Sequence, residues 1–148
     1  MANMNTSHRY VYDAAPATLF RARTAAALTA NGNSNTVNLD KLDGYWNTDG
    51  ELADETLAVI VNVTALDTAD GDETYSLALQ PLDGAGAALT GVSLGTLPIK
   101  GIGQYVLLVD AATVKQCGDL SALRIAATVA GTTPSITFHA WMSQIKKA

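Results

Sequence analysis

The stretch Leu57-Ala-Val-Ile-Val-Asn-Val-Thr64 decides the fold class of this chain. Its odd-numbered positions hold only Leu and Val, whereas its even-numbered positions turn polar at Asn62 and Thr64. Side chains alternate between the two faces of a strand, so this pattern predicts a β-strand with one face in a core. The same period of two recurs along most of the chain and helical periods are scarce, which indicates an all-β protein.

Seven further stretches between turn residues carry the alternation, and with residues 57–64 they predict about eight short strands. They are residues 24–29, 35–39, 75–80, 87–94, 104–109, 123–129 and 136–141. We expect residues 57–64 and 75–80 to form a hairpin whose tip is the acidic run 67–73, with Pro81 ending the second strand. The last two predicted strands form another hairpin across the turn 131–134.

The length of 148 residues is typical of one domain. Eight antiparallel strands with Gly-rich connections favour a two-sheet sandwich of the jelly-roll type. An immunoglobulin-like sandwich is the alternative, although its Cys and Trp spacing is absent. Residues 1–22 lack clean alternation and are predicted to be an N-terminal arm, which leaves 23–148 as the sandwich domain. One short helix is predicted over 110–117, because Asp110 can cap its start and Gly118 can end it.

The composition of the chain argues against several classes of function. Charged residues make up 16% of the chain, against about 25% in a typical globular protein, so we expect part of the surface to be covered by other proteins. A net charge of −5 argues against a nucleic-acid partner. The absence of a signal peptide pattern or a long apolar run argues against a membrane partner and predicts synthesis in the cytoplasm. The single cysteine, Cys117, excludes an intrachain disulfide and zinc sites built from several cysteines.

The charges are unevenly spread along the chain. Residues 40–83 contain eleven acidic residues and one base, Lys41. Bases gather near the two ends, at Arg9, Arg21, Arg23, Lys146 and Lys147. This asymmetry fits complementary patches that set the register of contacts between copies or with a shell, and it also fits ordinary solvated loops.

One motif resembles that of a serine hydrolase. Gly91-Val-Ser-Leu-Gly95 matches the nucleophile elbow, and Asp110 or Asp119 and then His139 follow in the hydrolase order. The elbow needs a helix directly after the serine, but Thr96-Leu-Pro98 follows instead. We therefore interpret Ser93 as a strand or turn residue and predict no catalytic site.

Metal and cofactor motifs are also incomplete. The run 67–73 offers four carboxylates for Ca²⁺ but lacks the EF-hand spacing, so we interpret it as a solvated tip. His8 and His139 have no second ligand at a metal-binding spacing. Gly101-Ile-Gly103 lacks the third glycine of a dinucleotide loop. We predict no metal and no cofactor.

Two large aromatic residues, Tyr45 and Trp46, lie in a stretch with turn chemistry and no alternation. Aromatic residues in loops fit a contact with a protein partner, a platform on which a sugar stacks, or a lid folded back on the sandwich.

Several segments together resemble the small capsid decoration, or cement, proteins of tailed bacteriophages. They are Thr24-Ala-Ala-Ala-Leu-Thr-Ala-Asn-Gly-Asn-Ser-Asn-Thr-Val-Asn-Leu39, the stretch 57–64, Asp70-Gly-Asp-Glu-Thr-Tyr-Ser-Leu-Ala-Leu-Gln80, Gly101-Ile-Gly-Gln-Tyr-Val-Leu-Leu-Val109, Leu123-Arg-Ile-Ala-Ala-Thr-Val129 and residues 136–141. The similarity covers most of the chain from about residue 24 and consists of composition and strand order, with no invariant motif. It implies a jelly-roll protein without enzymatic activity that binds the outside of the expanded head as trimers and stabilises the shell.

The resemblance also implies the partners and the location of the protein. The partners are the major capsid protein and further copies of the chain, and the location is the outer capsid surface of the virion. Terminal charge and loop aromatics select seven candidate contact residues, Arg9, Tyr10, Tyr12, Arg21, Arg23, Tyr45 and Trp46. The alternative function is a carbohydrate- or receptor-binding module on a virion, with Tyr45 and Trp46 as its platform.

Overall fold

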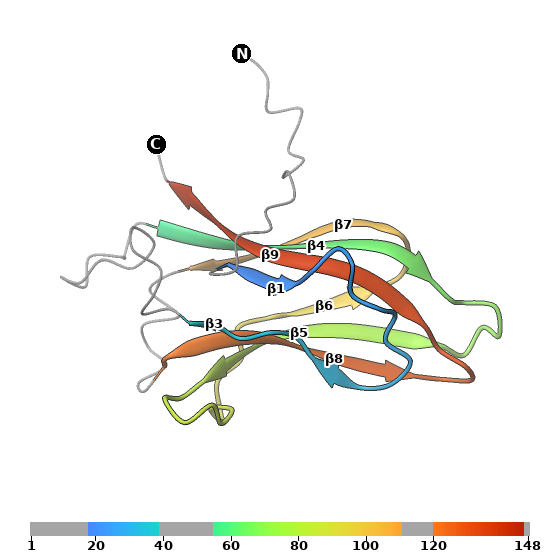
Figure 1. Ribbon diagram of the computed structural model, residues 1–148, viewed down its shortest axis with the longest axis horizontal. Helices are drawn as coiled ribbons and strands as arrows, with labels where there is room; N and C mark the ends of the chain where they lie inside the picture. Colours follow the sequence, from blue (N-terminus) through green and yellow to red (C-terminus); the bar gives the residue numbers. More distant parts are fainter. Residues whose placement is uncertain (1–17, 39–54, 111–119, 147–148) are drawn as a thin grey trace, which may run out of the picture.

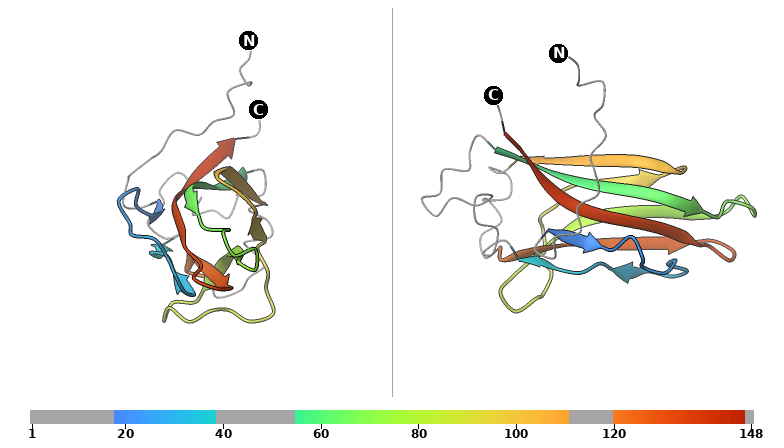
Figure 2. Two further views of the ribbon diagram at one scale, coloured as in Figure 1. Left: turned by 90° about the vertical axis from the view of Figure 1, so that its right-hand side faces the viewer. Right: turned by 45° about the horizontal axis from the view of Figure 1, so that its top comes forward.

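A computed structural model describes residues 18–38, 55–110 and 120–146 of the chain. These residues form nine β-strands and no helix, and the strands make two antiparallel sheets that lie face to face (Figures 1 and 2). The predicted all-β class and the two-layer sandwich are therefore confirmed. Within these ranges, no helix has the length and hydrophobicity needed to cross a membrane.

The first sheet has the strand order β1-β9-β4-β7 and the second has the order β2-β8-β5-β6, with β3 also paired to β8. The strands of the first sheet are β1 (Leu19–Arg21), β4 (Glu55–Leu66), β7 (Gly103–Asp110) and β9 (Ile136–Lys146). Those of the second are β2 (Gly32–Asn33), β3 (Val37–Asn38), β5 (Thr74–Leu82), β6 (Thr96–Ile99) and β8 (Ala122–Ala130). The five longest strands coincide with predicted ones, because each has the clear alternation of a half-buried strand.

Both predicted hairpins are wrong. β4 pairs with β7 and β9, whereas β5 pairs with β6 and β8, so the connection 67–73 crosses from one sheet to the other. The turn 131–134 likewise leads from β8 in the second sheet to β9 in the first. Both crossings lie at the same end of the sandwich (Figure 1). Alternation shows which face of a strand is buried. It does not show whether the next strand along the chain pairs with it in the same sheet or lies in the opposite sheet.

Three shorter predictions also differ from the structure. In the range 24–29 only Leu28 forms a bridge, to Ile136, and the strand β2 lies at Gly32–Asn33, between the predicted ranges 24–29 and 35–39. The range 87–94 is not a strand, because only Ala88 forms a bridge, to Leu82. The strand in this region is β6, which the sequence conceals because Pro98 lies within it.

The described residues thus hold nine strands where about eight are predicted. β5 continues through Pro81, whose backbone carbonyl accepts a hydrogen bond from Leu89 N at 2.9 Å. A proline can occupy a strand where no N–H is needed. The predicted helix over 110–117 and Cys117 fall largely outside the described residues, and Asp110 is the last residue of β7.

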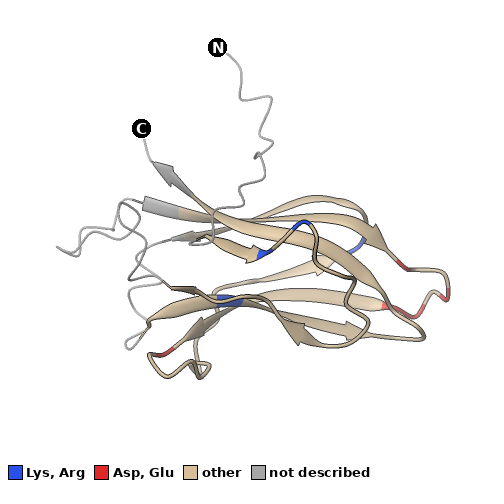
Figure 3. Cartoon of the chain, in the orientation of Figure 1, with Lys and Arg blue, Asp and Glu red and all other residues tan. Residues whose placement is uncertain are grey.

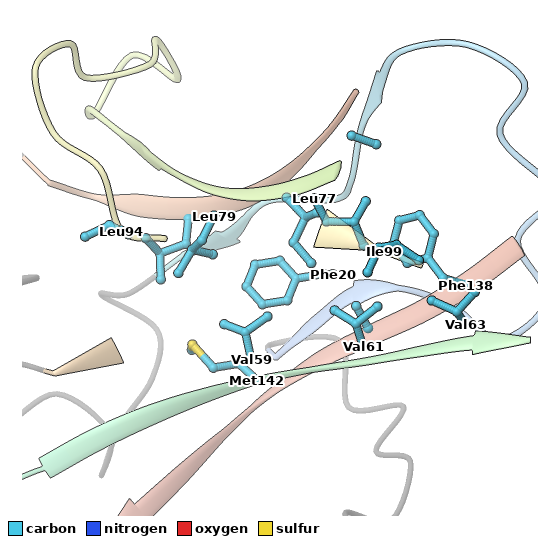
Figure 4. Packing of buried hydrophobic residues seen from close by; sticks show 14 of the residues in the cluster. Phe20, Val59, Val61, Val63, Leu77, Leu79, Leu94, Ile99, Phe138 and Met142 are labelled. Carbon is cyan, nitrogen blue, oxygen red and sulfur yellow. The ribbon is translucent and has the colours of Figure 1, made fainter. Parts of the chain in front are cut away.

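The core lies between the two sheets, and Phe20 from β1 occupies its centre (Figure 4). Phe20 is fully buried, with Val59 of the first sheet and Leu79 of the second in the same cluster. Residues 19–21 fall inside the predicted arm 1–22, but here they are an edge strand of the first sheet. The arm remains a prediction for residues 1–17, which lie outside the described residues.

Candidate interaction surface

The outer face of the first sheet carries an apolar row. Ile60 of β4 lies directly opposite Trp141 of β9 on one side and Val106 of β7 on the other. Leu19 of β1 is the register partner of Trp141 and packs against the same cluster. Ile60 and Trp141 are 0% and 2% exposed, so this side of the sheet holds a second buried cluster, separate from the core. β4 and β9 are therefore apolar on both faces near their centres.

The apolar surface continues to the edge of the sheet at β7. Ile102, Val106 and Leu108 are 68%, 37% and 58% exposed, and they are the large hydrophobic residues that are exposed in the described part of the chain. Leu108 is the register partner of Ala58, and Ile102 lies in the turn directly before β7. We call these three residues the β7 patch. Exposed hydrophobic residues gathered on one element indicate a binding surface.

A polar row lies beside the apolar one on the same outer face. Asn62 is the register partner of His139 and of Gln104. Gln104 Nε2 donates to Asn62 Oδ1 at 2.9 Å, and Asn62 Nδ2 lies 3.1 Å from His139 Nε2. Because the Asn62 oxygen already accepts from Gln104, its amide nitrogen faces the histidine, and Nε2 of His139 is the acceptor.

The His139 ring is buried at one end of this polar row. It stacks on Trp141 with the ring centroids 5.9 Å apart and the planes 10° from parallel. Burial lowers the pKa of His139, and the positive charge of Arg23 lowers it further. Through its contacts with Trp141 and Asn62, His139 joins the apolar row to the polar row.

The structure describes two of the seven candidate contact residues, Arg21 and Arg23. Arg21 Nε donates to the carbonyl of Phe138 at 3.1 Å, its Nη2 donates to the carbonyl of Ala26, and its guanidinium lies 4.9 Å from the Phe138 ring centroid. Burial lowers the pKa of Arg21. Arg21 therefore holds β1 and the segment after it against β9. Arg23 is exposed near the polar row. The other five are Arg9, Tyr10, Tyr12, Tyr45 and Trp46, and they lie outside the described residues.

The acidic connection 67–73 joins the two sheets and is held by hydrogen bonds. Its acidic residues are red in Figure 3. Asp72 accepts hydrogen bonds from Thr132 N at 3.0 Å and from Thr132 Oγ1 at 2.8 Å. These bonds lower the pKa of the Asp72 carboxyl. Asp70 Oδ2 accepts from Thr133 Oγ1 at 3.1 Å, and Glu73 Oε1 accepts from Asp70 N at 3.0 Å. The carboxylates thus tie one sheet-crossing connection to the other.

The same carboxylates form an acidic cluster. Oxygen atoms of Asp70, Asp72 and Glu73 lie within 4.8 Å of one another, a spacing that a cation can bridge. Asp70 and Asp72 are exposed, and both are already hydrogen-bonded to the neighbouring threonines. The cluster by itself therefore does not identify a metal site.

The residues of the hydrolase-like motif lie in different layers. Ser93 is exposed in the connection that leads to β6 of the second sheet. His139 points out from the first sheet toward Asn62 and Trp141. No hydrogen bond joins Ser93 to His139 in the described ranges, so this pair has no geometry for nucleophilic catalysis.

Compared with protein-family models, curated proteins and solved structures, the chain has no significant match. The sequence reasoning missed the surface on the outer face of the first sheet. Its signal is present in the even-numbered residues of β4, where Ile60 breaks the expected polar alternation, and in β9, where Trp141 does the same.

Proposed function

We propose that this protein is a non-enzymatic capsid decoration protein that binds the outside of an expanded phage head and stabilises the shell. Its partners are the major capsid protein and further copies of the chain, assembled as trimers on the virion surface. The sequence resemblance supports this proposal. The structural observation that supports it is the β7 patch, because an apolar strip on a rigid sheet suits burial against another protein, including a further copy of this chain within the decorating assembly.

We also propose the jelly roll as the finer description of the fold. If β2 and β3 count as one interrupted strand, because both pair with β8, four antiparallel pairs are nested along the chain. The outermost is β1 with β9, followed by β2/β3 with β8, β4 with β7, and β5 with β6. A long hairpin with this nesting, rolled into two sheets, has the connectivity of a jelly roll and supports that assignment.

The stabilisation follows from mass action. A protein that binds the expanded lattice and not the unexpanded one lowers the free energy of the expanded form by RT ln(1 + [L]/Kd) at each site. Many sites of modest affinity therefore add up over a shell. Binding of this kind needs complementary surfaces and no chemical step.

The experiment is co-sedimentation of the purified protein with unexpanded and expanded empty heads of the phage that encodes it, at low and high salt. We expect saturable binding to expanded heads alone, and a higher rupture temperature for the decorated heads. A salt-sensitive affinity would assign part of the contact to the cationic ends of the chain. Binding to neither form, or an unchanged rupture temperature at saturation, would contradict the proposed function.

A further inference from the structure

β7 is an unusual edge strand. It lies at one end of the order β1-β9-β4-β7, and β4 is its one sheet partner among the strands that the structure describes (Figure 1). Its register with β4 runs without a bulge from Gly103 to Asp110. An edge strand exposes a row of unpaired N–H and C=O groups, which is a template for pairing with another chain.

The other sheet edges carry features that oppose such pairing. β1 has 3 residues, β2 and β3 have 2 residues each, and β6 has 4 residues with Pro98 among them. Short strands and prolines are common means of protecting an edge. β7 has 8 residues, and from Gly103 to Val109 it contains no proline and no charged residue.

The same strand carries two residues of the β7 patch, Val106 and Leu108, and Ile102 of the patch directly precedes it. Val106 and Leu108 point away from the core. Tyr105 and Leu107, which alternate with them along the strand, pack against the core. The edge thus offers backbone hydrogen bonds and apolar side chains together. An uncharged, apolar edge of this length without a bulge is expected to be covered.

The residue pattern of β7 is complementary to itself. If two copies of β7 run antiparallel about a two-fold axis at Leu107, Val106 of one copy lies opposite Leu108 of the other. Tyr105 then lies opposite Val109, so apolar residues face apolar residues on both sides of the joined sheets. Each copy has a net charge of −5, but the central residues 105–109 that meet carry no charge, and Asp110 of each copy lies opposite the neutral Gln104 of the other, which avoids direct repulsion at the contact.

We propose that β7 is an interface with a second copy of this chain, in which the two β7 strands pair antiparallel and join two four-stranded sheets into one. Such a contact is isologous, because each copy uses the same surface. It goes beyond the proposed function, since it requires no capsid. It is also separate from a threefold contact, which would use other surfaces and would leave this pairing to join one trimer to another.

The first test is the mass of the full chain in solution by light scattering and sedimentation, without any phage heads. The variants are Val106→Lys and Leu108→Lys, and the matched control is Thr128→Lys, which places the same charge at an exposed position of β8 in the other sheet. We expect the native protein and the control to form assemblies with an even number of copies. Each β7 variant should halve the mass, from dimer to monomer, or from hexamer to trimer if a threefold contact also forms.

A native protein that is monomeric at ~100 µM would overturn the proposal, since so weak a contact would not hold two copies together in solution. An odd number of copies, or variants that keep the native mass, would overturn it too. Thermal unfolding of each variant shows whether the sandwich is intact, and a change of mass counts only for a folded variant.

A second test measures the register and does not depend on the charge variants. In a Cys117→Ser background, Val106→Cys and Leu108→Cys proteins are oxidised separately and as a mixture. Opposite Cβ atoms of an antiparallel pair lie about 4.5–5.5 Å apart, close enough for a disulfide after a small adjustment. We expect the mixture to give several-fold more cross-linked dimer than either protein alone. Equal yields in all three samples would contradict the proposed register and the pairing that rests on it.

Discussion

At the scale of single residues, protonation of the His139 side chain affects the stability of the sandwich. Its ring is buried against Trp141 and accepts from Asn62, so protonation would place a charge in a poorly solvated position and remove an acceptor. The pKa of His139 is lowered in the folded protein, first by burial and then by Arg23. The folded state therefore binds fewer protons than the unfolded state once the pH falls below about 6.5, the unfolded value.

We expect the contribution of His139 to the free energy of unfolding to be greatest above the pKa of His139 in the unfolded chain. The free energy of unfolding should then decrease as the pH falls from 7.5 to 5. His139→Gln should flatten this part of the profile, because Gln keeps an acceptor for Asn62 without titrating. The measurement is denaturant unfolding of both proteins at several pH values. Asp72 does not interfere, since its pKa is lowered from 3.8 and its own loss of stability falls in more acidic solution. An unchanged slope in the variant would exclude His139 as the cause.

Gly131 is a second position at which the fold depends on one residue, because a side chain there would not fit. It has a φ of 114°, and a Cβ there would lie 2.6 Å from the Glu73 Cα of the other sheet-crossing connection. We expect Gly131→Ala to lower the free energy of unfolding by about 1–3 kcal/mol or more, because both the backbone conformation and the close approach oppose a side chain.

The matched control for this change is Gly84→Ala, in the exposed connection after β5. A Cβ at Gly84 meets nothing within 4 Å, and its φ is not in the left-handed region. The control should remain within about 0.5 kcal/mol of the native protein in the same unfolding experiment. Equal effects at the two glycines would show that the two sheet-crossing connections are not held in close contact.

At the scale of elements, β1 is the shortest strand of the first sheet, and it contributes a central core residue. Phe20 is fully buried between the sheets, and Met142 N donates to the Thr18 carbonyl at 2.9 Å beside it. We expect Phe20→Ala to lower the free energy of unfolding by about 3–5 kcal/mol. Denaturant unfolding measures the change. A loss below about 1 kcal/mol would contradict a place for β1 in the sandwich and would restore the predicted arm 1–22 as a separate segment.

The long strands show what alternation can predict. β4, β7, β8 and β9 each contain the predicted range, because the residues that face the core recur at every second position along them. β2 and β6 were not, because strands of 2 and 4 residues are too short to show a period. Their positions depend on the neighbours β8 and β5, which supply the hydrogen bonds.

At the scale of the whole molecule, the nested pairing brings distant parts of the chain together. β1 pairs with β9, which lies more than a hundred residues later, and both sheet-crossing connections must be in place before the two sheets can close. Closing long loops before contacts form slows folding. We expect refolding from denaturant in milliseconds to seconds, measured by stopped-flow fluorescence of the tryptophans. Refolding in microseconds would contradict a transition state that contains these long-range pairs.

Local patterns in the sequence predicted the all-β class, the five longest strands and, within those strands, the residues that face the core. Each of these follows from local alternation, which depends on neighbouring residues only. The outer-face row of Ile60 and Trp141 was also present in the sequence, as apolar residues at positions where the alternation calls for polar ones.

Which strands pair, and therefore where the surfaces lie, depends on contacts between distant parts of the chain. β4 and β5 are adjacent in sequence but belong to different sheets, and β7 is an edge because β4 is its one partner among the described strands. Hydrogen-bonded pairing joins residues at any separation along the chain, and no local pattern states the partner. The polar row of His139, Asn62 and Gln104 exists only once β4, β7 and β9 lie side by side.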